Sequence, residues 1–188
     1  MKEAKKALRR ELIAARRDMP ESMRNECDGK IALALLSLPE YKNADTLLIY
    51  ASYGEEIDTK AIINAAQADG KRIAFPRCEA GGVMKFYYSR PEELVSGYKN
   101  IPEPKESAPL FCGSERALCV VPALAIDKKG FRIGYGGGFY DRFLAKFNGI
   151  SVGLVRNKFY FDKIVREEFD LSLDITVTEN GVIRNESK

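Results

Sequence analysis

The sequence predicts an α/β fold: a single domain over residues 1–188, built as a mostly parallel open sheet flanked by helices, with an N-terminal helical segment. Two observations predict it. Short apolar runs alternate with segments of helical periodicity, which is typical of parallel strands joined by helices. The length of 188 residues suits one well-filled core. No internal repeat and no low-complexity tract interrupts this pattern.

The first element is a helix with a basic outer face. Apolar residues recur at helical spacing from Lys2 to about Arg17, which predicts an amphipathic helix. Lys5 and Arg9 are four residues apart and therefore lie on one side of it. Together they could reach a phosphate chain, although a solvated surface is the simpler interpretation of such a face.

The remaining elements follow from apolar runs and from capping and breaking residues. A second helix is expected from a cap at Asp18 to Leu38, and a third from a cap at Asp58 to Gly70. The expected strands are 46–51, 72–76, 83–88, 117–121, 150–155 and 174–178, with a last helix at 139–147 and an irregular surface excursion at 89–116.

A glycine-rich stretch dominates the second half of the chain. Gly134, Gly136, Gly137 and Gly138 follow an apolar strand and run directly into the helix expected at 139–147. Glycine accepts positive φ and lets another molecule approach the backbone, and free N–H groups before a helix attract anions. The stretch therefore predicts a phosphate-binding loop. A tight turn without a ligand is the alternative.

Two common phosphate-binding motifs are excluded. No Lys-Ser or Lys-Thr pair closes the glycine stretch, so it is not a standard P-loop. Phe139 occupies the last glycine position of the G-x-G-x-x-G dinucleotide-binding pattern, so the sequence argues against a dinucleotide-binding fold.

Composition limits the chemistry. The chain has no histidine, which excludes a histidine-based triad and an imidazole proton shuttle. Its four cysteines are widely spaced and form no C-x-x-C pair, which argues against a metal knuckle or a redox motif. Catalysis must use carboxylates, lysine, arginine, tyrosine, backbone amides or a metal held by oxygen.

Charge and hydropathy limit the partners and the cellular location that the sequence predicts. The formal net charge of +3 is too small to predict nucleic-acid binding, although basic residues gather in the first helix. No run of about 18 apolar residues could span a membrane, and the N-terminus lacks the apolar core of a signal peptide. We therefore expect a cytoplasmic protein.

The glycine stretch also carries a family resemblance. Residues 130–142 closely resemble the signature of the 5-formyltetrahydrofolate cyclo-ligase family, also called methenyltetrahydrofolate synthetases. Lys5-x-x-Leu8-Arg9, residues 56–59, residues 101–104, Val121-Pro122 and residues 174–179 fall in the order of the family. The resemblance covers nearly the full chain.

The resemblance implies an ATP- and Mg²⁺-dependent closure of 5-formyltetrahydrofolate to 5,10-methenyltetrahydrofolate, with release of ADP and phosphate. The formyl oxygen would attack the γ-phosphate, and N10 of the folate would then displace phosphate. Phosphoryl transfer depends on positioning and charge neutralisation, so a site without histidine suffices.

The resemblance also assigns residues. It implies ATP contacts from Lys5, Arg9, Arg132, Gly134, Tyr135, Gly136, Gly137, Gly138, Phe139 and Tyr140, with catalytic roles for Lys5, Arg132 and Tyr140. It implies folate contacts from Glu56, Tyr135, Phe139 and Tyr140, and magnesium ligands Asp141 and Asp174. Asp174 could instead cap or pair, and Tyr140 could be a core residue.

Two other functions remain open. Residues 157–160 and Phe169-Asp170 replace a glutamine-proline and a histidine-aspartate pair that are usual in the family. This departure favours a folate- or nucleotide-binding protein that has lost catalysis on the same fold.

Nucleic-acid binding through the basic first helix is disfavoured, because that helix lacks interleaved aromatic residues. We therefore expect small-molecule substrates, no nucleic-acid or membrane partner, and a monomer.

Overall fold

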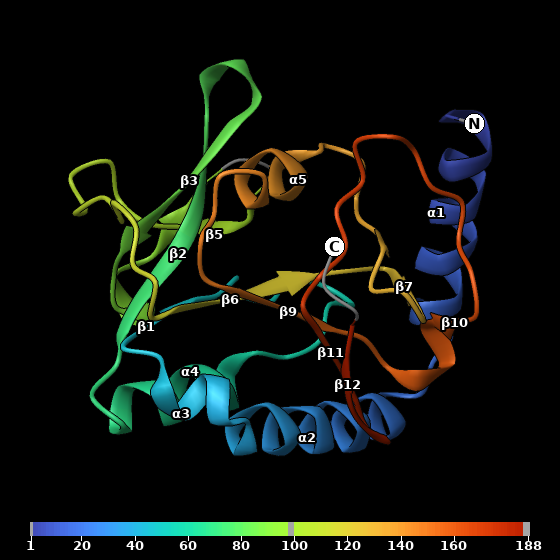
Figure 1. The fold of residues 1–188 in the computed structure, drawn as a ribbon, viewed down its shortest axis with the longest axis horizontal. Coiled ribbons are helices and arrows are strands. Elements are labelled where there is room, and N and C mark those ends of the chain that lie inside the picture. The colour runs from blue at the N-terminus through green and yellow to red at the C-terminus, as the bar shows by residue number, and fades with distance from the viewer. Residues whose placement is uncertain (1, 98–99, 186–188) are drawn as a thin grey trace.

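A seven-stranded sheet with helices on both faces forms the body of the protein (Figure 1). The computed structural model describes residues 2–97 and 100–185. The strand order is β12-β11-β9-β6-β1-β2-β3, with β11, β9, β6, β1 and β2 mutually parallel and the edge strands β12 and β3 antiparallel. The predicted α/β fold with a mostly parallel sheet is thereby confirmed, whereas the single domain over 1–188 stays a prediction.

The elements of the described chain have the following bounds. The helices are α1 (Lys2–Arg17), α2 (Glu21–Ser37), α3 (Pro39–Asn43), α4 (Lys60–Ala68) and α5 (Phe139–Leu144), with short 3₁₀ turns at Ala80–Gly82, Pro91–Glu93 and Asn157–Phe159. The large sheet contains β1 (Thr46–Leu48), β2 (Arg72–Glu79), β3 (Val83–Tyr88), β6 (Ala117–Pro122), β9 (Ile150–Leu154), β11 (Ile175–Thr178) and β12 (Gly181–Arg184). Two small sheets pair β4 (Val95–Ser96) with β5 (Pro102–Glu103), and β7 (Ala125–Asp127) with β8 (Arg132–Ile133) and β10 (Tyr160–Phe161).

The apolar core has two parts, one on each face of the large sheet. One face packs Ile31 and Leu35 of α2 and Ile62 of α4 against the strands. The other face packs Leu12 of α1 and the partly buried Phe143 of α5 against the sheet and against the small sheet of β7, β8 and β10. Burying each such side chain stabilises the fold by roughly 1.5–3 kcal/mol. In Figure 1, α2, α3 and α4 lie together on one side of the sheet, and α1 and α5 lie on the other.

Several element boundaries differ from the sequence prediction. β1 covers three residues instead of 46–51, and α5 ends at Leu144 instead of at 147. α2 begins at Glu21 after an N-cap at Pro20 that makes no side-chain cap bond, so Asp18 does not cap this helix. The N-cap of α4 is Thr59, although the preceding aspartate accepts a hydrogen bond from the Lys60 N–H at 3.0 Å.

The prediction also missed short elements. α3, β12 and the small sheet of β7, β8 and β10 were not expected, and the excursion at 89–116 contains the paired strands β4 and β5. Each of these elements has between two and five residues, which is too short for a hydrophobic period to be recognised. The small sheet matters for function, because β8 leads directly into the glycine stretch.

Candidate functional site

A cleft of about 710 Å³ lies where the parallel strands of the large sheet end. Its walls come from α1, from the loop that follows β1, from the carboxyl ends of β2 and β6, and from residues 132–141. In open α/β sheets, ligands bind beyond the carboxyl ends of the strands. This cleft is therefore the candidate functional site.

The basic face of α1 forms one wall of the cleft. Lys5 is 3% exposed, and its Nζ lies 3.0 Å from Glu167 Oε2 and 2.5 Å from Asp170 Oδ2. Arg9 donates from Nε to the carbonyl oxygen of Gly134 at 2.9 Å. The predicted pair of cations is thus directed into the cleft and not into solvent.

The glycine stretch forms the facing wall. Gly136 has φ of 101°, and a Cβ placed on it would lie 3.3 Å from the Arg9 guanidinium carbon. Gly138 has φ of 64° and is the N-cap of α5. At both positions the left-handed backbone disfavours any other residue. The sequence predicted that a helix dipole would contribute positive charge here. Because α5 has only six residues, that contribution is small, and the positive charge at this wall comes mainly from arginine.

Arg132 and Asp141 meet at the end of the glycine stretch. Arg132 is 7% exposed, and its Nη2 lies 3.0 Å from Asp141 Oδ1. Its Nη1 is buried and has no hydrogen-bond partner among the described residues. A buried N–H without a partner is rare in folded proteins, and a bound oxygen-rich ligand is one way to satisfy it.

Glu56 lines the same cleft from the loop after β1. Burial raises the pKa of the Glu56 carboxyl to about 7. The Tyr53 N–H, which donates to Oε2 at 2.9 Å, and the positive charge of Arg16 act in the opposite direction and lower this pKa. Burial and the neighbouring Glu56 carboxylate also raise the pKa of the Tyr135 hydroxyl. This end of the cleft therefore holds a carboxyl group that changes charge near neutral pH.

Aromatic residues 139 and 140 line the cleft beside the glycine stretch. The Tyr140 ring meets the Phe86 ring edge-on at 6.2 Å between centroids. The Tyr140 hydroxyl is buried and lacks a partner within the described residues. Burial raises the pKa of this hydroxyl well above its ordinary value. It is therefore a neutral donor available to an oxygen atom of a bound ligand.

The sequence analysis missed a third cation on α1. Arg16 is 1% exposed, and its Nη2 donates to the carbonyl oxygens of Ala123 at 2.5 Å and Leu124 at 3.0 Å. It lies seven residues after Arg9, so helical spacing alone would have placed it on the same face.

Asp174 lies apart from the other predicted site residues. It precedes β11 and accepts hydrogen bonds from the Ser151 N–H at 2.8 Å and Oγ at 2.6 Å, at the amino end of β9. It is not among the residues that line the cleft, whereas Asp141 is. The structure therefore does not bring Asp141 and Asp174 together, and their shared magnesium site stays a prediction.

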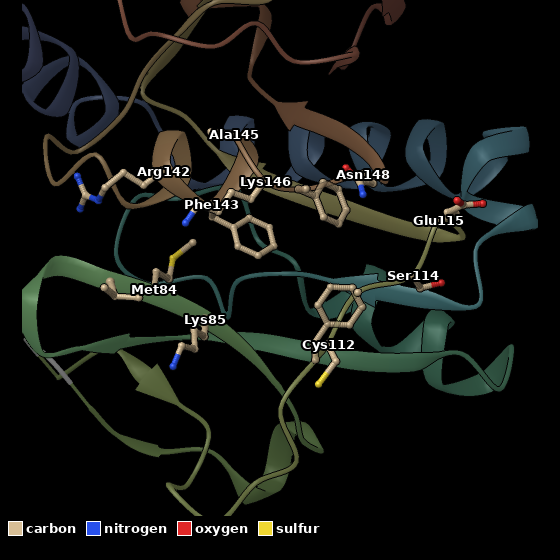
Figure 2. A pocket seen from close by; sticks show the side chains of 14 residues that line it. Met84, Lys85, Cys112, Ser114, Glu115, Arg142, Phe143, Ala145, Lys146 and Asn148 are labelled. Atoms are coloured by element: carbon tan, nitrogen blue, oxygen red, sulfur yellow. The ribbon is translucent and has the colours of Figure 1, made fainter.

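A second groove, of about 900 Å³, lies between β3 and α5 (Figure 2). Met84 and Phe143 line its apolar floor, while Lys85 and Lys146 stand at its rim. The glycine stretch, the arginines of α1 and Glu56 contribute nothing to it. The groove thus lacks the convergent polar groups that distinguish the cleft, although Met84 lines both.

Comparisons with known proteins agree on one family. The model of the 5-formyltetrahydrofolate cyclo-ligase family matches residues 1–179. A 5-formyltetrahydrofolate cyclo-ligase of Escherichia coli K12 is 30% identical over 177 residues, which cover 89% of this chain and 96% of the relative. One from Mycolicibacterium smegmatis is 30% identical over 189 residues, covering 96% of each chain.

A solved structure agrees with these relatives. The 5,10-methenyltetrahydrofolate synthetase of Aquifex aeolicus superposes with a TM-score of 0.86 at 28% identity, covering 98% of this chain and 94% of that one.

A relative from Arabidopsis thaliana, 28% identical, is described as mitochondrial. Within residues 2–97 and 100–185, no helix has the length and apolarity needed to cross a membrane.

Proposed function

The chain belongs to the 5-formyltetrahydrofolate cyclo-ligase family, and we propose that the cleft beside α1 is where its ATP and 5-formyltetrahydrofolate react. Family membership makes the protein an enzyme of folate one-carbon metabolism that uses ATP. One observation carries the placement: the cations of α1 and β8, the glycine stretch and the Glu56 carboxyl group all line one cleft. Such a cleft can hold a polyphosphate at one end and a neutral heterocycle at the other.

The phosphate end would be formed by cations and backbone. Lys5, Arg9 and Arg132 supply positive charge, while residues 134–138 allow close approach of phosphate oxygens to the backbone. The unpartnered Nη1 of Arg132 supports this placement, because a phosphate oxygen would satisfy it. In this arrangement the cations neutralise the charge that spreads over the transferred phosphoryl group.

The folate end would be formed by Glu56 with the aromatic residues Tyr135, Phe139 and Tyr140. The carboxylate of Glu56 can accept hydrogen bonds from the N–H groups of a pterin, and the rings can lie against its flat face. This arrangement would bring the formyl group next to the γ-phosphate.

The reaction then has two steps. The formyl oxygen attacks the γ-phosphorus, the bond to the bridging oxygen breaks, and ADP leaves. N10 attacks the activated formyl carbon and releases its proton to solvent, the carbon–oxygen bond breaks, and phosphate leaves with the oxygen. Lys5 and Arg132 would stabilise the phosphoryl charge, and the Tyr140 hydroxyl would donate to the oxygen that carries it.

Asp141 is the residue that fits a magnesium ion in this cleft. Mg²⁺ keeps several waters and takes one or two protein carboxylates together with substrate phosphates. Among the residues that the structure describes, no group of three metal-ligating side chains is assembled. The carboxylate of Asp141, held beside Arg132, therefore suits an ion that is shared with ATP and is not held by the protein alone. When bound, the ion would neutralise phosphate charge.

A spectrophotometric assay tests the proposal. Purified protein mixed with 5-formyltetrahydrofolate and MgATP is expected to produce the absorbance of the methenyl product, and omission of ATP is expected to abolish it. Binding of folate without ATP hydrolysis would favour the alternative of a non-catalytic binding protein. Monomeric state, cytoplasmic location and the lack of a nucleic-acid partner stay predictions.

Folate use is expected to depend on pH through Glu56. Its pKa of about 7 lies above the ordinary carboxyl value, so the carboxylate is fully present only above pH 7 and is lost as the pH falls. If the carboxylate binds the pterin, kcat/KM for folate should fall about tenfold per pH unit below 7. Initial rates from pH 5.5 to 8.5 measure this. Glu56→Gln should give a low and flat profile, and an unchanged slope in that variant would assign the titration to another group.

A further inference from the structure

A buried ion pair underlies the loop that carries Glu56. Arg156, which follows β9, is 1% exposed. Its Nε lies 2.7 Å from Asp28 Oδ1, and its Nη2 lies 2.8 Å from Asp28 Oδ2. Asp28 belongs to α2 and is 7% exposed. The guanidinium and the carboxylate thus face one another in a two-pronged pair that links α2 to the carboxyl end of β9.

Both members of the pair also bind the backbone of the loop. Arg156 donates from Nη1 to the carbonyl oxygen of Glu55 at 3.2 Å and from Nη2 to that of Glu56 at 3.3 Å. Asp28 Oδ2 accepts a hydrogen bond from the Asp58 N–H at 3.0 Å. The backbone is therefore held at Glu55, at Glu56 and at Asp58, while Glu56 lines the cleft.

Stability alone is a weak explanation for this arrangement. Taking an arginine and an aspartate out of water costs free energy that their attraction often only just offsets, and apolar replacements of the same size can be equally stable. What an apolar pair could not supply is two N–H donors and a carboxylate acceptor aimed at consecutive backbone groups of a loop. Loops without such bonds move more than the elements they connect.

We propose that Arg156 and Asp28 are positioning residues that fix the Glu56 carboxylate for folate binding. This inference rests on the folate contact proposed for Glu56. The hydrogen bonds of the pair go to the loop that carries Glu56 and not to the glycine stretch, Lys5 or Arg9, so its main effect should be at the folate end of the cleft. Loss of the pair should weaken folate use and leave ATP use intact.

A double-mutant cycle between Arg156 and Glu56 tests this. Arg156→Met is expected to raise the KM for folate about tenfold or more and to leave the KM for ATP unchanged. Glu56→Gln is expected to raise the KM for folate as well. If Arg156 acts through Glu56, the double variant should be no worse than Glu56→Gln alone, whereas independent effects would multiply.

Two further variants separate positioning from stability. Leu35→Ala removes a fully buried side chain of α2 that makes none of the hydrogen bonds holding the loop, so it should lower the melting temperature and keep the wild-type KM for folate. Asp28→Asn retains a carbonyl oxygen for the Asp58 N–H, so its KM for folate should rise less than that of Arg156→Met. It also provides the second arm of the cycle if Arg156→Met does not fold.

The outcomes distinguish the folate contact of Glu56 from the positioning role of Arg156 and Asp28. A wild-type KM for folate in Glu56→Gln would overturn the proposed folate contact, and the positioning role with it. A raised KM in Glu56→Gln combined with multiplying effects, or with an unaffected Arg156→Met, would overturn the positioning role alone. A KM for folate that rises equally in Leu35→Ala would assign the effect to general destabilisation.

Discussion

Asp141→Asn is expected to lower kcat by about 100-fold or more while leaving the KM for folate nearly unchanged. The amide can still accept the hydrogen bond that Arg132 Nη2 makes to Oδ1 at 3.0 Å, so the loop should keep its shape. What is lost is the negative charge that we propose holds a magnesium ion against the phosphates of ATP. Initial rates measured against magnesium concentration, with ATP saturating, should show a large rise in the half-saturating concentration.

Asp174→Asn is the informative comparison for this prediction. Both hydrogen bonds from Ser151 go to one carboxylate oxygen, which an amide oxygen can replace, so the expected loss of stability is only about 1 kcal/mol, with an unchanged magnesium dependence. Thermal melting and the same magnesium titration measure both quantities. A similar magnesium shift in the two variants would show that both carboxylates serve the ion, as the sequence predicted. A normal magnesium response in Asp141→Asn would remove that residue from the metal site.

The sequence was sufficient for the order and type of the main elements because their signals are local and repeated. The apolar runs that became β2, β6, β9 and β11 are bounded by turns, and α1 shows its period over four turns. The ends of elements were less predictable. β1 and α5 stop early because hydrogen bonding to neighbouring segments, and not apolar content, decides where a strand or helix ends.

The site residues also differ in whether a local sequence pattern could indicate them. The glycine stretch and the Lys5–Arg9 pair are contiguous or helically spaced, so the sequence could indicate them, and the structure places both in one cleft. Arg156 and Asp28 are 128 residues apart and carry no motif, so only the fold brings them together. Asp174 shows the converse limit, because resemblance assigned it a role without information on which end of the sheet it occupies.

Lys5→Ala is expected to raise the KM for ATP about tenfold or more and to lower kcat by about 100-fold, since it would remove the charge-assisted phosphate contact proposed for this largely buried side chain. The matched control is Lys6→Ala, because Lys6 is the adjacent residue of α1 but is exposed. Its kinetics should equal those of the wild type. Initial rates with varied ATP at saturating folate measure both variants, and wild-type kinetics in Lys5→Ala would exclude Lys5 from the phosphate site.

Part of the expected loss in Lys5→Ala comes from the carboxylates that Lys5 now neutralises. Glu167 Oε2 lies 3.0 Å from Nζ, and without the lysine this carboxylate would stand unpaired beside the incoming phosphates. Like charges at such short range repel, which weakens ATP binding beyond the loss of the cation itself. Adding Glu167→Gln to Lys5→Ala should therefore lower the KM for ATP again without restoring kcat. Equal KM values in the single and double variants would show that Glu167 plays no part in nucleotide affinity.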